Sequence, residues 1–429
     1  MGEIEITFLG GAKEVGRAAY WIKDGKASLL LDYGVNFDEE DNPVFPEYVS
    51  PKDLGAIILS HAHLDHSGAL PLLYSAVRKP IYMTRVTKDL IEILIQDFLK
   101  LSGYYVPYGH TELKEMLDAV RLVEYRRPLE IAEAGGTLLT FYDAGHIPGS
   151  AMVKLELPSG VKVLYTGDVR KSETQLLRGA DLEGLEADIL LIEATYGTLD
   201  HPDRRDVEAL FVSDIREVVE EGGTVLVPAF SVGRGQEVLS VIEDHGLEVP
   251  VALDGMVKGV TELILQGENK KFLKNPDLLE RAYEKAYVVK GWRDRRRVWR
   301  RPGVIIASAG MLRGGPSLYY ARKIQEISKD AIFLVSFQAP GTPGRRLVQE
   351  GRIDEGGPMV QARVEWFDFS SHAGASELME IIRSVKGLKK VIIVHSEEKT
   401  AEKFAERVRQ ETGLDVIVPE RGSTIKIEV

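Results

Sequence analysis

The hydrophobic pattern of this chain changes character twice. In the first 200 residues and again near the end, short apolar runs such as 55–59, 187–192 and 391–394 recur, which is typical of buried strands. From about residue 201 such runs alternate with amphipathic segments at helical spacing. Strand–helix alternation predicts a parallel sheet with flanking helices, a domain of its own.

The alternating stretch is expected to contain helices at 206–220, 235–244, 256–265 and 317–327 and strands at 224–227, 249–253, 304–307 and 331–337. Elsewhere we expect strands at 4–9, 18–22, 27–31, 81–84, 360–367, 415–418 and 424–427, an amphipathic helix at 87–100, and helical spacing over 68–77. The glycine-rich residues 10–16 stand between two strands, so they predict a hairpin loop. A dinucleotide-binding loop would have to open a helix.

One short segment carries most of the candidate chemistry. Residues 60–66 have the sequence S-H-A-H-L-D-H, which places four metal-binding side chains within six positions: His61, His63, Asp65 and His66. The first two, two apart in an extended loop, can face one ion. The other two follow once the chain begins to turn and can face a second ion. Imidazole and carboxylate together suit Zn²⁺, Mn²⁺ or Fe.

A predicted hairpin adds two more candidates. His146 precedes the outgoing strand at 151–157 and Asp168 follows the returning strand at 161–166. Antiparallel pairing brings both to the same end of the hairpin. We therefore expect His146 and Asp168 to complete a binuclear site with the first cluster.

Four further polar residues stand where predicted elements end: Asp32, Glu193, His372 and His395. Asp32 is either a turn former or a partner that orients a metal-bound histidine. Glu193 ends an apolar strand and is either a site residue or a helix cap. His110 lies in a polar loop and is expected to be a surface histidine.

Composition narrows the function classes. With 429 residues, 44% hydrophobic, the chain should form two or three globular domains. The absence of cysteine excludes disulfides, thiolate metal sites and cysteine nucleophiles. No signal peptide or spanning apolar run is visible, so we expect a cytoplasmic protein without membrane contact.

The net charge and the local charge distribution favour different conclusions about nucleic-acid binding. A net charge of -12 argues against a nucleic-acid binder, but a local patch and bound cations set the field where substrate docks. Residues 292–301 hold six arginines and two tryptophans, which suits phosphates and stacked bases, or else a solvated face. Glycine-rich loops at 308–311 and 341–346 follow strands and could hold phosphates through backbone N–H groups.

Several motifs together resemble a known family. H-A-H-L-D-H at 61–66 with His146, Asp168 and His395 resembles the metallo-β-lactamase superfamily. The β-CASP branch is indicated by Asp32 and by E-A-T-Y-G at 193–197, P-A-F-S-V-G-R-G-Q at 228–236, S-A-G-M-L at 308–312, F-S-S-H-A at 369–373 and V-H-S-E at 394–397. The chain is most similar to compact archaeal nucleases like the cleavage and polyadenylation specificity factor, without KH domains. Ser396 departs from the glycine common in that position, and no KH region precedes Met1.

The resemblance implies an α/β architecture. An αββα metallo-β-lactamase sandwich would be formed by residues 1–200 and 348–429, with a β-CASP domain inserted at 201–347. It also implies two Zn²⁺ ions per chain, one held by His61, His63 and His146, the other by Asp65, His66 and His395, with Asp168 bridging them.

The same resemblance implies a zinc-dependent ribonuclease, endonucleolytic and in part 5′-to-3′ exonucleolytic. Asp65 would accept the proton of the attacking water, His372 would donate one to the leaving oxygen, Glu193 would orient His372, and Asp32 would support the ligands. Ser308, Arg345 and Arg346 are candidate RNA contacts. A DNA-directed β-CASP nuclease and a small-molecule thioester hydrolase remain alternatives. Homodimerisation and association with RNA-processing factors stay open.

Overall fold

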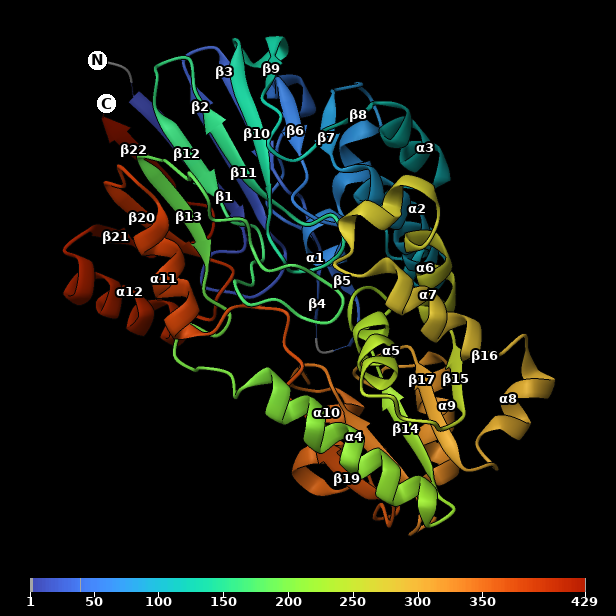
Figure 1. The fold of residues 1–429 in the computed structure, drawn as a ribbon. Helices are drawn as coiled ribbons and strands as arrows, with labels where there is room; N and C mark the ends of the chain where they lie inside the picture. The colour runs from blue at the N-terminus through green and yellow to red at the C-terminus, as the bar shows by residue number, and fades with distance from the viewer. Residues whose placement is uncertain (1–2, 39, 429) are drawn as a thin grey trace. The chain divides into compact units, whose positions relative to one another are not determined.

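The computed structural model describes residues 3–38 and 40–428 and divides the chain into two compact units (Figure 1). The first unit contains the chain up to Ser172, the segment Gly179–Asp200 and everything from His372 onward. The second contains Glu173–Arg178 and His201–Ser371. An inserted unit explains why the hydrophobic pattern changes in the middle of the sequence and reverts near its end.

Within the described residues, the first unit is built on two seven-stranded sheets. The first sheet has the order β22 (Thr424–Glu428), β1 (Glu3–Gly10), β2 (Ala19–Asp24), β3 (Ala27–Leu31), β6 (Ala56–Ile58), β7 (Ile81–Met83) and β8 (Val120–Leu122). The second has the order β21 (Asp415–Ile417), β20 (Lys390–Val394), β13 (Ile189–Glu193), β12 (Lys162–Tyr165), β11 (Ala151–Glu156), β10 (Thr137–Asp143) and β9 (Leu129–Ile131). A short ribbon pairs β4 (Asn36–Phe37) with β5 (Pro43–Val44).

The two sheets pack face to face around a shared core. Alternate residues of β1 (Ile4, Ile6 and Phe8) point inward and are fully buried, against inward residues of the second sheet such as Phe141 and Val163. This period of two is the one that the strand pattern predicts. Because strands from residues 3–200 and from 390–428 share both sheets, the two ends of the polypeptide fold as one body.

Helices cover the outer faces. The outer face of the second sheet packs against α11 (Ala375–Ser384) and α12 (Glu398–Thr412) through apolar side chains such as Leu378 and Phe404. In Figure 1, α2 (Arg85–Ser102) and α3 (His110–Asp118) lie beside the β6–β8 end of the first sheet. The arrangement is an αββα sandwich. The unit also contains α1 (Leu64–Ser67) and the short 3₁₀ turns η1 (Pro51–Asp53), η2 (Leu70–Tyr74) and η3 (Ala132–Ala134).

The second unit has a parallel sheet, as the alternating pattern predicts. In its described part the order is β16 (Tyr287–Val288), β15 (Val251–Asp254), β17 (Gly303–Ala307), β14 (Thr224–Pro228), β18 (Ala331–Leu334) and β19 (Arg363–Trp366). Its helices are α4 (Arg204–Glu220), α5 (Arg234–Asp244), α6 (Met256–Ile264), η4 (Gly267–Phe272), α7 (Pro276–Lys285), α8 (Trp292–Val298), α9 (Gly315–Ile324) and α10 (Pro343–Glu350).

Three local differences from the sequence analysis have physical causes. The second unit runs to Ser371 rather than to residue 347, because β19 pairs with β18 at the edge of its sheet. Within residues 68–77 only Leu70–Tyr74 is helical, as the 3₁₀ turn η2 with Pro71 in its first turn, instead of a longer helix. Asp65 and His66 already lie in the short helix α1.

The predicted hairpin loop near the N-terminus is present. The glycine-rich residues 10–16 join β1 to β2, which pair antiparallel, so this segment is a hairpin loop. Within the described part of the chain, no helix combines the length and the apolar character that crossing a bilayer requires.

Candidate metal centre

Polar side chains gather where strands of the first unit end. His61 follows β6, and Asp65 and His66 belong to α1 directly after it. His146 lies between β10 and β11, Asp168 follows β12, and His395 follows β20. The strands carry these residues to one edge of the sandwich from positions more than 300 residues apart in the chain.

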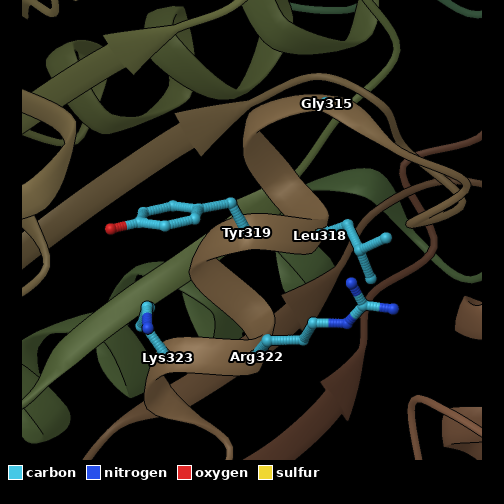
Figure 2. A pocket seen from close by; sticks show the side chains of 5 residues that line it. All are labelled: Gly315, Leu318, Tyr319, Arg322 and Lys323. Carbon is cyan, nitrogen blue, oxygen red and sulfur yellow. The ribbon is translucent and has the colours of Figure 1, made fainter. Parts of the chain in front are cut away.

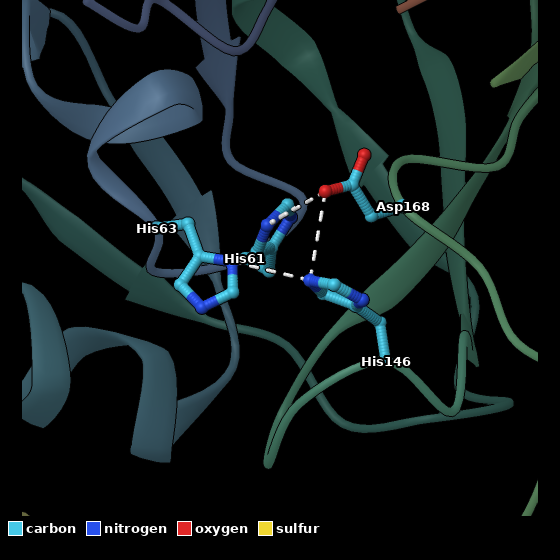
Figure 3. Close-up of side chains that lie close together, drawn as sticks. All are labelled: His61, His63, His146 and Asp168. Carbon is cyan, nitrogen blue, oxygen red and sulfur yellow. Dashed lines mark hydrogen bonds and ion pairs between the residues drawn. The ribbon is translucent and has the colours of Figure 1, made fainter. Parts of the chain in front are cut away.

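Figure 3 shows the first group, in which His61, His63, His146 and Asp168 point toward one another. Each offers one ligand atom, and these atoms all lie within 4.8 Å of one another. His63 Nδ1 lies 3.1 Å from His146 Nε2. Asp168 Oδ2 lies 3.6 Å from His61 Nε2 and 3.5 Å from His146 Nε2. Three imidazoles and a carboxylate at such separations form a set that can hold one divalent cation.

The second group contains Asp65, His66, Asp168 and His395, again with ligand atoms within 4.8 Å. Asp65 Oδ2 lies 3.3 Å from His395 Nε2 and 4.0 Å from His66 Nε2. His395 reaches this place with a φ of 48°, a left-handed conformation that residues other than glycine rarely adopt. The surrounding sheet therefore holds His395 in a strained conformation at the site.

Asp168 belongs to both groups through different oxygen atoms. Its Oδ2 faces His61 and His146, whereas its Oδ1 lies 3.3 Å from His66 Nε2 and 3.4 Å from His395 Nδ1. The side chain is only 2% exposed. A buried carboxylate with one oxygen turned to each group is the geometry of a bridging ligand between two cations.

Asp32 fixes the orientation of His66. Its Oδ2 accepts hydrogen bonds from His66 Nδ1 and from the Tyr165 hydroxyl, both at 2.7 Å, while Oδ1 accepts from the Ser60 N–H at 2.7 Å. The carboxylate is fully buried and sits at a φ of 56° after β3. With Nδ1 engaged, Nε2 of His66 is directed toward Asp168. A carboxylate behind a ligating histidine has this effect in metalloenzymes.

Charges and burial in the site fit cations. Burial lowers the pKa of His61 and of His63, so both rings stay neutral, the form that binds metal. Burial alone would raise the pKa of Asp65 and of Asp168, but the adjacent histidines outweigh it and lower both pKa values. Among the described residues, the buried atoms His61 Nε2, His66 Nε2 and Asp168 Oδ1 have no hydrogen bond of normal geometry. Such atoms are costly unless an ion satisfies them.

His372 stands beside Asp168 but faces another partner. Its Nδ1 lies 2.8 Å from Glu193 Oε1, and its Nε2 lies 4.0 Å from Asp168 Oδ2. Burial alone would lower the pKa of His372, but the carboxylates of Glu193 and Asp168 outweigh it and raise the pKa to about 9. Glu193 is itself fully buried and accepts the Val169 N–H at 2.9 Å, so its position is fixed.

The candidate RNA contacts lie in the other unit and already have partners. The Ser308 hydroxyl accepts a hydrogen bond from the Met256 N–H at 3.0 Å. Arg346 donates to the Ile353 carbonyl at 3.0 Å, and the Arg345 N–H donates to the Thr342 hydroxyl at 3.2 Å. These contacts hold the loops in place.

Some supporting residues escaped the sequence analysis. The Thr195 hydroxyl lies 3.3 Å from His395 Nδ1, and the Ser60 hydroxyl lies 3.1 Å from His61 Nδ1 while donating to Asp32. Tyr165 binds Asp32 from across the sheet interface. Ser60 directly precedes His61, and Thr195 lies two positions after Glu193. Their closeness in sequence to predicted site residues could have indicated them. Nothing in the sequence pattern singles out Tyr165. His110 is exposed at the start of α3, as expected for a surface histidine.

Comparison with known families covers most of the chain. Residues 22–193 match the metallo-beta-lactamase superfamily domain, residues 236–347 the Beta-Casp domain, and residues 357–419 the Zn-dependent metallo-hydrolase RNA specificity domain. A solved protein of unknown function from Enterococcus faecalis V583 shares the fold with a TM-score of 0.60 at 14% identity, covering 99% of this chain and all of the other.

Curated archaeal proteins are similar to nearly the whole of this chain. RNase aCSPSF2 of Saccharolobus solfataricus is 46% identical over 98% of this chain and 85% of its own. Probable RNase MJ4 of Methanocaldococcus jannaschii is 36% identical over 99% of this chain and 100% of its own. Transcription termination factor FttA of Pyrococcus horikoshii is 34% identical over 99% of this chain and 71% of its own. The chain therefore belongs to the β-CASP branch of the metallo-β-lactamase superfamily and is a metal-dependent hydrolase.

Proposed function

We propose that this enzyme is a ribonuclease that hydrolyses RNA phosphodiester bonds with two Zn²⁺ ions, by internal cleavage and in part by 5′-to-3′ removal of nucleotides. The observation that carries the proposal is Asp168, whose two oxygens face two separate ligand groups while His372 stands 4.0 Å away. A site for two cations beside a proton donor is what in-line cleavage of a phosphodiester requires.

Each cation would have three ligands of its own and share Asp168. His61, His63 and His146 would hold one; Asp65, His66 and His395 would hold the other. When bound, the two ions supply Lewis acidity, which lowers the pKa of a shared water and neutralises charge on the phosphodiester. Zinc fits a donor set without thiolates, and the RNA specificity family matched by residues 357–419 is described as Zn-dependent.

Two groups would transfer protons: one would accept a proton from the attacking water, and the other would donate a proton to the leaving oxygen. The Asp65 side chain is 33% exposed, compared with 2% for Asp168, so it is the carboxylate open to an attacking water and would accept its proton at an Oδ atom. His372 would donate a proton from Nε2 to the departing 3′-oxygen. Glu193 would hold His372 Nδ1 and thereby favour the protonated ring.

RNA is favoured as substrate by the relatives. Two of them are named RNases, at 46% and 36% identity over nearly the whole chain. This substrate also suggests the cytoplasm as the place of action, and the domain assignment follows the matched families: metallo-β-lactamase parts on either side of an inserted β-CASP part. Homodimerisation and partner factors are compatible with this function but are not needed for it.

The test compares 5′- and 3′-labelled RNA with a DNA strand of the same sequence, incubated with zinc-loaded enzyme. We expect internal RNA fragments with 5′-phosphate ends, and much slower cleavage of DNA. Faster cleavage of DNA would favour the DNA-directed alternative. If the enzyme leaves RNA intact but turns over a simple thioester rapidly, the small-molecule alternative is favoured. Either result would overturn the proposal.

A further inference from the structure

A segment of the second unit concentrates positive charge in a chain whose net charge is -12. Residues 290–301 contain a single carboxylate, Asp294, and many cationic side chains: Lys290, Arg293, Arg295, Arg296, Arg297, Arg300 and Arg301. The segment includes α8. Since exposed charges of an acidic protein are expected to be mixed, the concentration itself calls for a physical explanation.

One arginine fastens this segment to the body of the unit. Arg295 donates from Nε and Nη2 to both oxygens of Asp254, at 2.7 and 2.9 Å. Asp254 is fully buried at the end of β15 and also accepts the Tyr320 hydroxyl at 2.7 Å. A two-pronged, buried contact of this kind fixes the helix in one orientation. The rest of α8 is consequently presented to solvent in a defined way.

Four other arginines of this segment are not paired with carboxylates of the described part of the protein. Arg293, Arg297, Arg300 and Arg301 are exposed, and none of them has an ion pair within 4 Å among the described residues. Elsewhere in the same unit, exposed arginines do find acids, as Arg322 does with Asp354. The arginines of this segment are thus available to an anion from outside.

Aromatic rings stand among these cations. Trp292 is 61% exposed, and its ring meets that of Tyr319 edge to face at 5.4 Å. Lys323 places its ammonium 5.7 Å from the Tyr319 ring. The guanidinium of Arg300 lies 5.0 Å from the ring of Trp299. Trp292 is the exposed ring of this set, whereas Tyr319 and Trp299 are half-buried against the core of the unit. An exposed ring beside cations is a combination on which an unpaired base can stack while phosphates are neutralised.

A shallow hollow adjoins the rings. It is lined by Gly315, Leu318, Tyr319, Arg322 and Lys323 of α9 and has a volume of about 270 Å³. In Figure 2, Tyr319 and Lys323 project to one side of the helix and Leu318 and Arg322 to the other. Pockets for drug-sized ligands are typically about 300–1,000 Å³, so this hollow suits one flat ring better than a larger molecule.

We propose that α8 and the neighbouring face of α9, the α8–α9 surface, bind a single-stranded segment of the RNA substrate. The inference rests on the proposed function in taking RNA as the substrate, but the binding itself needs neither bound metal nor cleavage. A purely acidic partner would need the arginines but not the exposed ring of Trp292. Base-paired RNA would supply phosphates but hide its bases. Unpaired RNA uses both features.

The contacts predict how such binding behaves. Phosphate contacts make affinity fall with salt, and stacking is tolerant of base identity. Nothing on the surface is required to recognise the 2′-hydroxyl. A DNA strand should therefore bind to it nearly as well as RNA, even though cleavage prefers RNA.

The test measures binding of a cleavage-resistant 2′-O-methyl oligouridine of about twenty nucleotides to the full chain, in chelator, as a function of salt. The triple variant Arg293→Gln, Arg297→Gln, Arg300→Gln should bind at least tenfold more weakly. Its slope of log affinity against log salt should be shallower by about 2, at roughly 0.7 for each lost phosphate contact. Trp292→Ala should weaken binding by about tenfold with little change in slope. In the wild type, binding should quench a fluorescence component that Trp292→Phe lacks.

A matched control removes three exposed lysines of the first unit, Lys26→Gln, Lys52→Gln and Lys403→Gln, and should leave affinity and slope close to wild type. Turnover of bis(p-nitrophenyl) phosphate, a small phosphodiester, should be unchanged in the α8 variants, which separates this surface from the catalytic site. Wild-type affinity and slope in the triple variant would overturn the inference, and so would equal losses in the lysine control. Failure of the wild type to cleave any RNA while these binding losses are observed would refute the proposed function and leave the α8–α9 surface standing.

Discussion

Glu193 Oε1 lies 2.8 Å from Nδ1 of His372, at the end of a strand in which every residue is buried. The other ring nitrogen of His372 points toward Asp168, 4.0 Å away. The end of β13 thus holds the imidazole of a residue 179 positions away, between a carboxylate that raises its pKa and the candidate metal centre. This relationship leads to the first two predictions, which test the proposed role of His372 as a proton donor.

Replacing His372 should separate chemistry from metal binding. In His372→Ala the donor at the leaving oxygen is lost, and kcat for RNA cleavage should fall about 10²–10⁴-fold, the usual contribution of a general acid. The metal content of the purified protein should stay at the wild-type value, because the remaining ligand groups are intact. A variant that cleaves RNA at the wild-type rate would show that His372 is not the donor.

Replacing Glu193 by glutamine should change the pH dependence. As the proposed acid, His372 would work in its protonated form. With its pKa raised to about 9 it stays protonated at neutral pH, so activity should fall only as the pH rises through that value. Glu193→Gln keeps the shape but removes the charge, so the alkaline fall in kcat should move to lower pH. A pH–rate profile of both proteins, with saturating zinc, measures the shift. An unmoved alkaline limb would mean that Glu193 is structural only.

Asp32 should control metal affinity without being a ligand. Its hydrogen bond to His66 Nδ1 sets the direction of Nε2, so Asp32→Asn should weaken the affinity for one cation by about 10–100-fold. Competition with a chromophoric chelator measures this loss. Tyr165→Phe is the matched control, because it removes a different hydrogen bond to the same carboxylate; its effect should be smaller. Equal affinities in the wild type and Asp32→Asn would contradict the account.

The buried contact between Asp254 and Arg295 should matter for stability. Asp254→Ala leaves Arg295 and the Tyr320 hydroxyl without their acceptor, and the free energy of unfolding should fall by about 3–5 kcal/mol. The exposed pair of Arg322 with Asp354 provides the control: Arg322→Ala should cost about 1 kcal/mol or less. Urea unfolding monitored by circular dichroism compares the two. Losses of similar size would show that Asp254 does not hold α8.

Some of this centre can be read from the sequence and some cannot. The H-A-H-L-D-H segment and the hairpin between His146 and Asp168 are local features, so their chemistry shows in residue type and strand pattern. The structure brings His395 to the same place because β20 pairs with β13 in the middle of the second sheet, a contact between residues about 200 positions apart. No local pattern encodes that pairing. The roles of Asp32 and Glu193 are ambiguous in the sequence for a related reason. A carboxylate at a strand end gives the same sequence pattern whether it caps a turn or holds a histidine.

The boundary of the second unit shows the same limit. The strand predicted at 360–367 exists as β19, but its partner could not be chosen from its own residues. Its pairing with β18 places it in the parallel sheet of the second unit. The basic segment at 292–301 was ambiguous between a solvated face and a binding face. The buried anchor at Arg295 and the lack of acids within ion-pair distance of its exposed arginines, among the described residues, favour the binding face.

The central claim is that Asp168 bridges two cations, and metal stoichiometry tests it most directly. Protein loaded with zinc and freed of excess should contain two ions per chain by elemental analysis. Asp168→Ala should retain fewer than one, while His110→Ala, which removes an exposed histidine outside the site, should retain two. A wild-type protein that binds one ion or none, or an Asp168→Ala protein that still binds two, would contradict the account.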